Sequence, residues 1–201
     1  IRDVAVTGVQ TCALPISGDP LRVGFLGRFD PVKGLHVLVE AFRGLPPEIR
    51  ASLDVHGLAN DDDGRAYENR VRALAGEDER IRFLPPVPGE DVLGTLRRFD
   101  VLAVPSQWME TGPLVVMEAI AAGTPVLGSR LGGIAELVRP GVDGWLVTHD
   151  LPGAWRAALL EICAAGALSA AAGSGRPART MHDVAGDMKR VYDELAGSAA
   201  A

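Results

Sequence analysis

Two cations lie close together in a loop between an apolar run and a helix-like segment. Arg28 and Lys33 belong to the stretch GRFDPVKG, residues 27–34. Gly27 ends the apolar run, where the absence of a Cβ lets a ligand approach the backbone. An arginine fork and a lysine point charge beside free helix N–H groups suit a phosphate or a diphosphate. The alternative is that both cations are solvated on the surface beside Asp30.

A second candidate anion site lies in PSQWMETGPLVVMEAIAAGTPV, residues 105–126. Pro113 suits a first helical position and Gly123 suits the left-handed position after a last turn, so a helix is expected from Pro113 to Ala122. Such a free helix end attracts anions. Three N–H groups would have no partner within the helix: those of Leu114, Val115 and Val116.

Two glutamates flank this helix start. Glu110 precedes the helix, and Glu118 lies in its second turn. A carboxylate accepts hydrogen bonds from two hydroxyls at once, as the vicinal diols of a sugar offer. A polyhydroxylated group attached to a phosphate is therefore the favoured ligand. The alternative is that Glu118 is an exposed helix residue and Glu110 a partner of the helix dipole.

The elements that position these residues alternate between strand-like and helix-like runs. Predicted strands lie at 21–27, 53–57, 81–86, 101–106, 124–129 and 143–148. Predicted helices lie at 33–46, 64–76, 91–99, 113–122, 134–138, 154–165 and 181–196. The strands are short and apolar, which indicates that both sheet faces are covered. The alternation predicts a single α/β domain with a doubly wound, Rossmann-like parallel sheet, which binds ligands beyond the carboxyl ends of its strands.

Composition excludes several classes of protein. The 201 residues are 47% hydrophobic and 23% charged, as in a soluble globular domain. The net charge of −6 argues against a nucleic-acid-binding surface. Cys12 and Cys163 form no metal-ligand spacing and no disulfide framework, which favours a reducing, cytoplasmic compartment. Asp61–Asp63 lack the alternating spacing of calcium ligands and are expected in a solvated loop. Ser106 is not followed by a nucleophile-elbow pattern.

Taken in order, the motifs resemble the nucleotide-binding, C-terminal half of retaining glycosyltransferases with two Rossmann-like domains (GT-B), called glycosyl transferases group 1 or family 4. The resemblance runs from Leu21 to Ala165. It rests on GRFDPVKG at 27–34, the pair Glu110 and Glu118, EAIAAGTPV at 118–126, GGIAELV at 132–138 and GVDGWLV at 141–147.

The resemblance implies a role for each charged candidate. Arg28 and Lys33 would be catalytic, holding the diphosphate of a nucleotide-sugar donor and stabilising it as it leaves. Glu110 would also be catalytic and would address hydroxyls of the donor sugar, and Glu118 would bind those of the ribose. No metal and no cofactor would be needed, because the cations and the helix end replace a metal.

The resemblance also implies backbone and base contacts. The base would lie against Leu84 and Pro85. The family often has Gly-Phe-Gly between its two glutamates. At the end of an earlier strand it often has Val-Gly-x-Gly, where this sequence has Val55-His56-Gly57. His56 and Gly57 are expected near the nucleotide, unless His56 is only a partly buried loop residue. The loop expected to meet sugar and phosphates comprises Thr111, Gly112, Pro113, Leu114 and Val115.

The leading hypothesis is the donor-binding half of a retaining hexosyltransferase. In the family, the acceptor binds an N-terminal domain that this chain does not show, so residues 18–201 are expected to bind a nucleotide sugar weakly and to transfer nothing. Any peripheral membrane association would then involve only the missing half. The alternatives are a nucleotide-sugar epimerase or phosphorylase, and a non-catalytic sugar-nucleotide-binding or scaffold module.

The two ends of the chain carry separate expectations. VTGVQTCALPIS, residues 6–17, matches the in-frame translation of a common short-read sequencing adapter, although it also reads as a weak strand. Residues 1–17 are therefore expected to be non-native and without function, and Cys12 not to be a cysteine of the protein. The last helix, 181–196, is expected to expose apolar side chains and to favour self-association: Val184, Met188, Val191 and Leu195.

Overall fold

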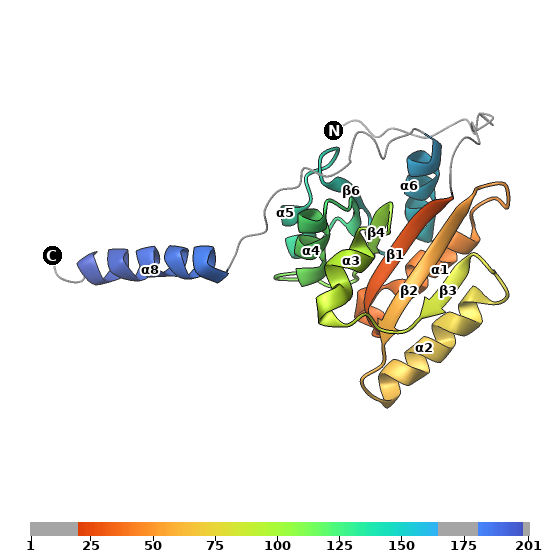
Figure 1. The fold of residues 1–201 in the computed structure, drawn as a ribbon, viewed down its shortest axis with the longest axis horizontal. Helices are drawn as coiled ribbons and strands as arrows, with labels where there is room; N and C mark the ends of the chain where they lie inside the picture. The colour runs from red at the N-terminus through yellow and green to blue at the C-terminus, as the bar shows by residue number, and fades with distance from the viewer. Residues whose placement is uncertain (1–19, 165–180, 199–201) are drawn as a thin grey trace.

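A parallel sheet forms the centre of the molecule. The structure, a computed structural model, describes residues 20–164 and 181–198. The six strands lie in the order β3-β2-β1-β4-β5-β6 (Figure 1). They are β1 (Leu21–Arg28), β2 (Ala51–Leu58), β3 (Ile81–Leu84), β4 (Val101–Val104), β5 (Val126–Ser129) and β6 (Gly144–Val147). Because the chain reverses its direction of travel between β1 and β4, the sheet is doubly wound, as predicted.

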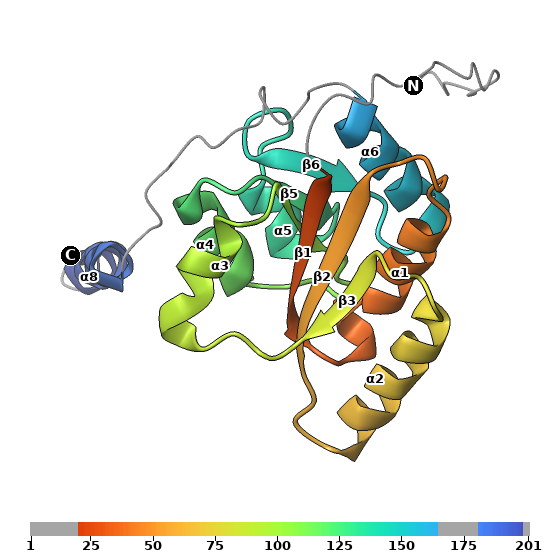
Figure 2. The same ribbon diagram turned by 45° about the vertical axis from the view of Figure 1, so that its right-hand side comes forward.

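Helices cover both faces of the sheet (Figure 2). One face carries α1 (Leu35–Arg43), α2 (Asp62–Ala75) and α6 (Pro152–Ala164). The other carries α3 (Val92–Leu96), α4 (Leu114–Ala122) and α5 (Gly132–Leu137). Two short 3-10 turns, η1 (Pro31–Lys33) and η2 (Gly89–Asp91), lie in the loops. The single α/β domain is therefore confirmed.

The alternation of side chains along the strands produces a hydrophobic core on each face. All four residues of β4 are buried: Val101 and Ala103 belong to the core under α1, and Leu102 and Val104 to the core under α4. This explains why the strands read as continuous apolar runs rather than alternating ones.

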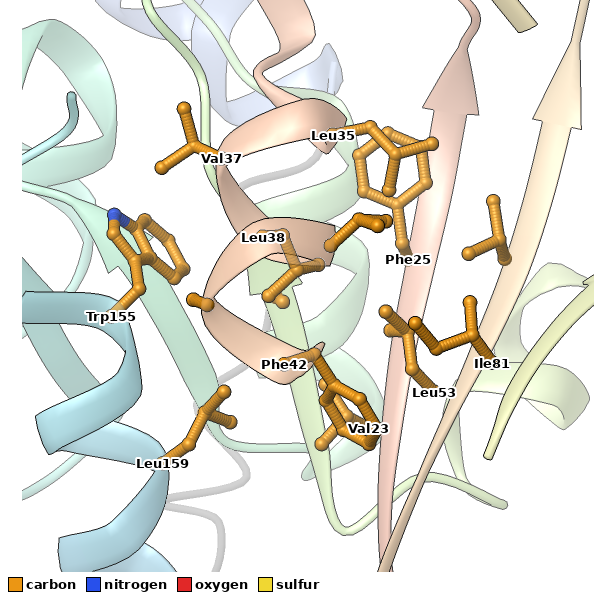
Figure 3. Packing of buried hydrophobic residues seen from close by; sticks show 14 of the residues in the cluster. Val23, Phe25, Leu35, Val37, Leu38, Phe42, Leu53, Ile81, Trp155 and Leu159 are labelled. Carbon is orange, nitrogen blue, oxygen red and sulfur yellow. The ribbon is translucent and has the colours of Figure 1, made fainter. Parts of the chain in front are cut away.

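The larger core is built around α1 (Figure 3). Leu38 and Phe42 point from α1 into this core, where Val23 of β1 and Leu53 of β2 also lie. On the far side of α1, α6 contributes the fully buried Trp155 and Leu159. α1 is thus held between the sheet and α6, which fixes the position of the loop that precedes it.

The last described helix, α8 (Met181–Ser198), lies apart from the sheet and its helices in both views (Figures 1 and 2). Met188, Val191 and Leu195 are exposed, as predicted, and Val184 is half-buried. Self-association through this helix stays a prediction. Within the described ranges, no helix is long and apolar enough to cross a membrane. The expectations for residues 1–17 fall outside those ranges.

Candidate functional site

A cavity of about 310 Å³ opens beyond the carboxyl ends of β1 and β4. Its floor is apolar, with Phe25 and Leu26 of β1 and Ala103 and Val104 of β4. Most of the residues predicted from the first two motifs lie on its walls: Gly27, Arg28, Lys33, Glu110, Gly112, Pro113, Leu114 and Val115. The two candidate anion sites therefore face one cavity, at the position where a doubly wound sheet binds its ligands.

An ion pair joins the two loops that form the cavity walls. Nζ of Lys33 lies 2.6 Å from Oε1 of Glu110, and the side chains are 28% and 19% exposed, respectively. Oγ of Ser106 lies 2.9 Å from the same carboxylate oxygen. Arg28, by contrast, is exposed and lies 3.4 Å from Asp30. Both sequence-predicted cations therefore already have a carboxylate partner.

The loop that carries Lys33 is shaped by its own residues. The carboxylate of Asp30 accepts a hydrogen bond from the Val32 N–H, which caps η1. Gly34 ends the turn with φ 68°, a left-handed conformation that glycine adopts without strain. A Cβ at Gly34 would lie 1.8 Å from the carbonyl oxygen of Pro105. Only glycine lets this loop pack directly on the segment that follows β4.

The start of α4 differs slightly from the expectation. Pro113 is the residue before the helix rather than its first residue, and its carbonyl accepts a hydrogen bond from Val116 N–H at 3.0 Å. The prediction of a free N–H at Val116 was therefore wrong, because the preceding turn satisfies it. The N–H groups of Leu114 and Val115 donate no hydrogen bond to the described part of the chain. Two donors, rather than three, therefore have no partner there, and both belong to residues that line the cavity.

The motif that begins with Gly132-Gly133 packs directly against the backbone of the Glu110 loop. The N–H of Gly133 donates to the carbonyl of Glu110 at 2.6 Å, and a Cβ on Gly133 would lie 2.7 Å from that carbonyl. Gly132 has φ 49°. These two glycines let the start of α5 approach the loop closely, which fixes the backbone of Glu110.

A neighbouring group lies along the same edge of the sheet, at the ends of β2 and β3. The register pairs Gly27 with Gly57, and His56 with Leu84. Nδ1 of His56 donates to the carbonyl of Pro85 at 2.7 Å, which fixes the ring. Gly57 is buried against Phe29, whose ring a Cβ would overlap at 2.2 Å. These residues lie beside the cavity, along the same edge of the sheet, but do not line it.

Two further predicted residues lie outside the cavity wall. Glu118 is half-buried on α4, and its side chain forms no hydrogen bond or ion pair with the described residues. Thr111 is exposed in the loop before α4. Their donor-binding roles stay predictions.

The contacts that hold the two loops together were not predicted from the sequence. Ser106 is 1% exposed and contacts both Glu110 and the carbonyl of Val32. The backbone of Gln107 donates to the same Val32 carbonyl, and its side chain donates to the carbonyls of Pro105 and His149. Their position directly after a buried strand was the available signal.

The acidic run Asp61–Asp63 has a structural role. Asp61 caps α2 by accepting from the N–H of Gly64 at 2.7 Å, and Asp62 pairs with Arg65. All three aspartates are exposed, as predicted, but Asp62 and Asp63 belong to the first turn of α2 rather than to a loop. No group of three potential metal ligands lies within the described ranges.

Comparisons with known proteins agree with this geometry. Residues 12–174 match the family described as glycosyl transferases group 1. A D-inositol 3-phosphate glycosyltransferase of Mycolicibacterium gilvum (strain PYR-GCK) is 39% identical over 149 residues, which are 71% of this chain and 32% of that protein. The chain spans about a third of the length of the first such relatives.

Solved structures share the fold. A sucrose-phosphate synthase from Thermosynechococcus elongatus matches with a TM-score of 0.74 and 28% identity, over 90% of this chain and 46% of that one. Anabaena HepE, solved in complex with UDP, matches with a TM-score of 0.73 and 24% identity, over 89% of this chain and 49% of that one. In both cases the described fold corresponds to about half of the larger GT-B structure.

Proposed function

Because the chain belongs to glycosyl transferases group 1, we propose that it is the donor-binding half of a retaining hexosyltransferase. Such an enzyme moves a sugar from a nucleotide diphosphate sugar to an acceptor. One observation carries the proposal: a single cavity is lined by Lys33, Arg28 and the first two residues of α4, whose N–H groups have no partner in the described part of the chain. Cations and a helix start together suit a diphosphate.

The proposed chemistry uses charge rather than a metal. As the bond between the sugar and the diphosphate breaks, negative charge grows on the leaving oxygen. Lys33 and Arg28 would stabilise that charge from positions fixed before the reaction, so little reorganisation is needed. The position of Lys33 and Arg28 on the cavity wall supports a reaction that needs no metal ion.

The remaining predicted residues would recognise the rest of the donor. Glu110 would accept hydrogen bonds from hydroxyls of the sugar, with the backbone from Thr111 to Pro113 nearby. Glu118, which has no partner among the described residues, would bind the ribose. The base would lie along the edge formed by His56, Gly57, Leu84 and Pro85, since these continue the site beyond Gly27.

The acceptor would bind elsewhere in a longer protein. The relatives that this chain resembles are named as D-inositol 3-phosphate glycosyltransferases, and the chain spans about a third of their length. An N-terminal acceptor-binding domain is therefore the proposed partner. The chain alone is expected to bind the donor weakly and to transfer nothing. Sugar transfer by the isolated chain would contradict this part of the proposal.

Calorimetric titration of the chain with UDP, GDP and ADP tests the binding function. At least one nucleotide is expected to bind, and Glu118→Ala is expected to weaken that binding by about 10-fold, as for the loss of a hydrogen bond to a charged group. Glu161→Ala, which removes an exposed glutamate from α6, is the matched control and should change nothing. If none of the three nucleotides binds, the donor-binding proposal fails and a scaffold role is favoured.

A further inference from the structure

A buried hydroxyl lies between the two cavity loops. Ser106 follows β4 by two residues and is 1% exposed. Its Oγ lies 2.9 Å from Oε1 of Glu110, 3.1 Å from the carbonyl oxygen of Val32 and 3.4 Å from that of Trp108. Each of these three oxygens accepts hydrogen bonds, whereas the hydroxyl has a single proton. Ser106 therefore donates to one of them at a time.

This arrangement decides where the Glu110 carboxylate lies. When Ser106 donates to Oε1, the same oxygen accepts from Lys33 at 2.6 Å, and the carboxylate is held from two sides. When the carboxylate moves away, Ser106 can donate to Val32 instead. A buried donor is then never left unsatisfied, which would otherwise cost about 1–3 kcal/mol. The carboxylate can leave Lys33 without that penalty.

The carboxylate of Glu110 neutralises Lys33, the cation that an anionic ligand would need. Lys33 and Glu110 are both mostly shielded from water, so their attraction is stronger than that of an exposed pair. Arg28 is more exposed, and its distance to Asp30 is longer. Of the two cations on the cavity wall, Lys33 is therefore the one whose charge is more fully balanced before any ligand arrives.

We propose that Ser106 is a positioning residue, which holds the Glu110 carboxylate in place as an internal counter-ion of Lys33. An anionic ligand then displaces this carboxylate from Lys33. Only the identity of that ligand, a nucleoside diphosphate, rests on the proposed function. Once displaced, the carboxylate is free to accept hydrogen bonds from hydroxyls of the same ligand. Release of the counter-ion would thus couple diphosphate binding to sugar recognition.

The reactivity of Lys33 tests this placement of Glu110 without any ligand. The sequence has two lysines, Lys33 and Lys189, and Lys189 lies on α8 with its side chain 75% exposed. The rate at which a small amine-reactive reagent labels each lysine is measured by peptide mass spectrometry. Ser106→Ala and Glu110→Gln should each speed labelling of Lys33 by about 2-fold to 10-fold, the range for one lost hydrogen bond. Lys189 is the internal reference and should not change.

Nucleotide titration tests the competition. Glu110→Gln should bind UDP more tightly than the parent chain does, and the gain should vanish in the Lys33→Ala background. Unchanged Lys33 labelling in Glu110→Gln, which leaves Ser106 in place, overturns the inference even if UDP binds. Faster labelling of Lys33 in the variants, together with no binding of UDP, GDP or ADP, instead supports the counter-ion role of Glu110 and overturns the proposed function. Weaker binding of UDP by Glu110→Gln contradicts the counter-ion role.

Discussion

Lys33 and Glu110 are separated by 77 positions in the sequence, yet their charged atoms lie 2.6 Å apart. The topology explains this contact, because β1 and β4 are neighbours at the point where the direction of winding reverses. The loops after these two strands therefore meet. The contact ties the charge of one motif to that of the other.

The close approach of the two loops depends on Gly34. Gly34→Ala should lower the free energy of unfolding by more than about 3 kcal/mol, because a Cβ would overlap the Pro105 carbonyl in addition to the cost of the left-handed backbone. Gly123→Ala is the control: it has φ 80° but open space around a Cβ, and it should cost about 1–2 kcal/mol. Urea unfolding of both variants measures the difference. Equal losses would contradict the close packing.

The docking of α6 on α1 depends on Trp155. Its ring is fully buried beside α1 (Figure 3). Its Nε1 donates to the carbonyl of Thr148 at 3.1 Å. Trp155→Ala should lower the free energy of unfolding by about 3–5 kcal/mol, the usual cost of a large core deletion. Trp108→Ala removes a ring that is 67% exposed and should change it by less than about 0.5 kcal/mol. Comparable losses in chemical denaturation would show that α6 is not docked as described.

His36 predicts a dependence of stability on pH. Burial, with a smaller contribution from Arg70, lowers the pKa of His36 below its usual value of 6.5. Its Nδ1 lies 2.7 Å from the hydroxyl of Tyr67, which suits a neutral ring that accepts the hydroxyl proton. As the pH falls below 6.5, the unfolded chain binds a proton that the folded chain resists, so stability is lost from there down to the folded pKa.

Urea midpoints at about pH 8 and about pH 5.5 measure this effect, since the window lies below the usual histidine pKa. The parent chain should lose more stability between these two pH values than His36→Gln, which cannot titrate. The other histidines are present in both proteins and therefore cancel in the comparison. An equal loss in both proteins would exclude His36 as the cause.

The sequence predicts the architecture well because both faces of the sheet are buried. Runs such as Val101–Val104 read as strands since every residue is apolar, and the structure divides them between two cores. The cavity-lining residues after β1 and before α4 were also predicted, because turn and helix-start signals are local.

Contacts between distant loops were not predictable in the same way. The pairing of Lys33 with Glu110 and the role of Ser106 depend on which loops meet, and no local pattern encodes this. Ser106 was excluded as a nucleophile, and its role as a buried hydrogen-bond donor was not predicted. The N–H of Val116 was expected to be free, but the turn at Pro113 satisfies it.

The most direct test of a diphosphate site at Lys33 is the affinity of Lys33→Ala for UDP, GDP and ADP, with Lys189→Ala as the matched control on α8. At least one nucleotide should bind the parent chain, and Lys33→Ala should weaken this binding by about 10-fold to 100-fold, the range for a charge-assisted hydrogen bond. Lys189→Ala should bind like the parent. Binding that is equally strong in both variants would contradict a diphosphate site at Lys33.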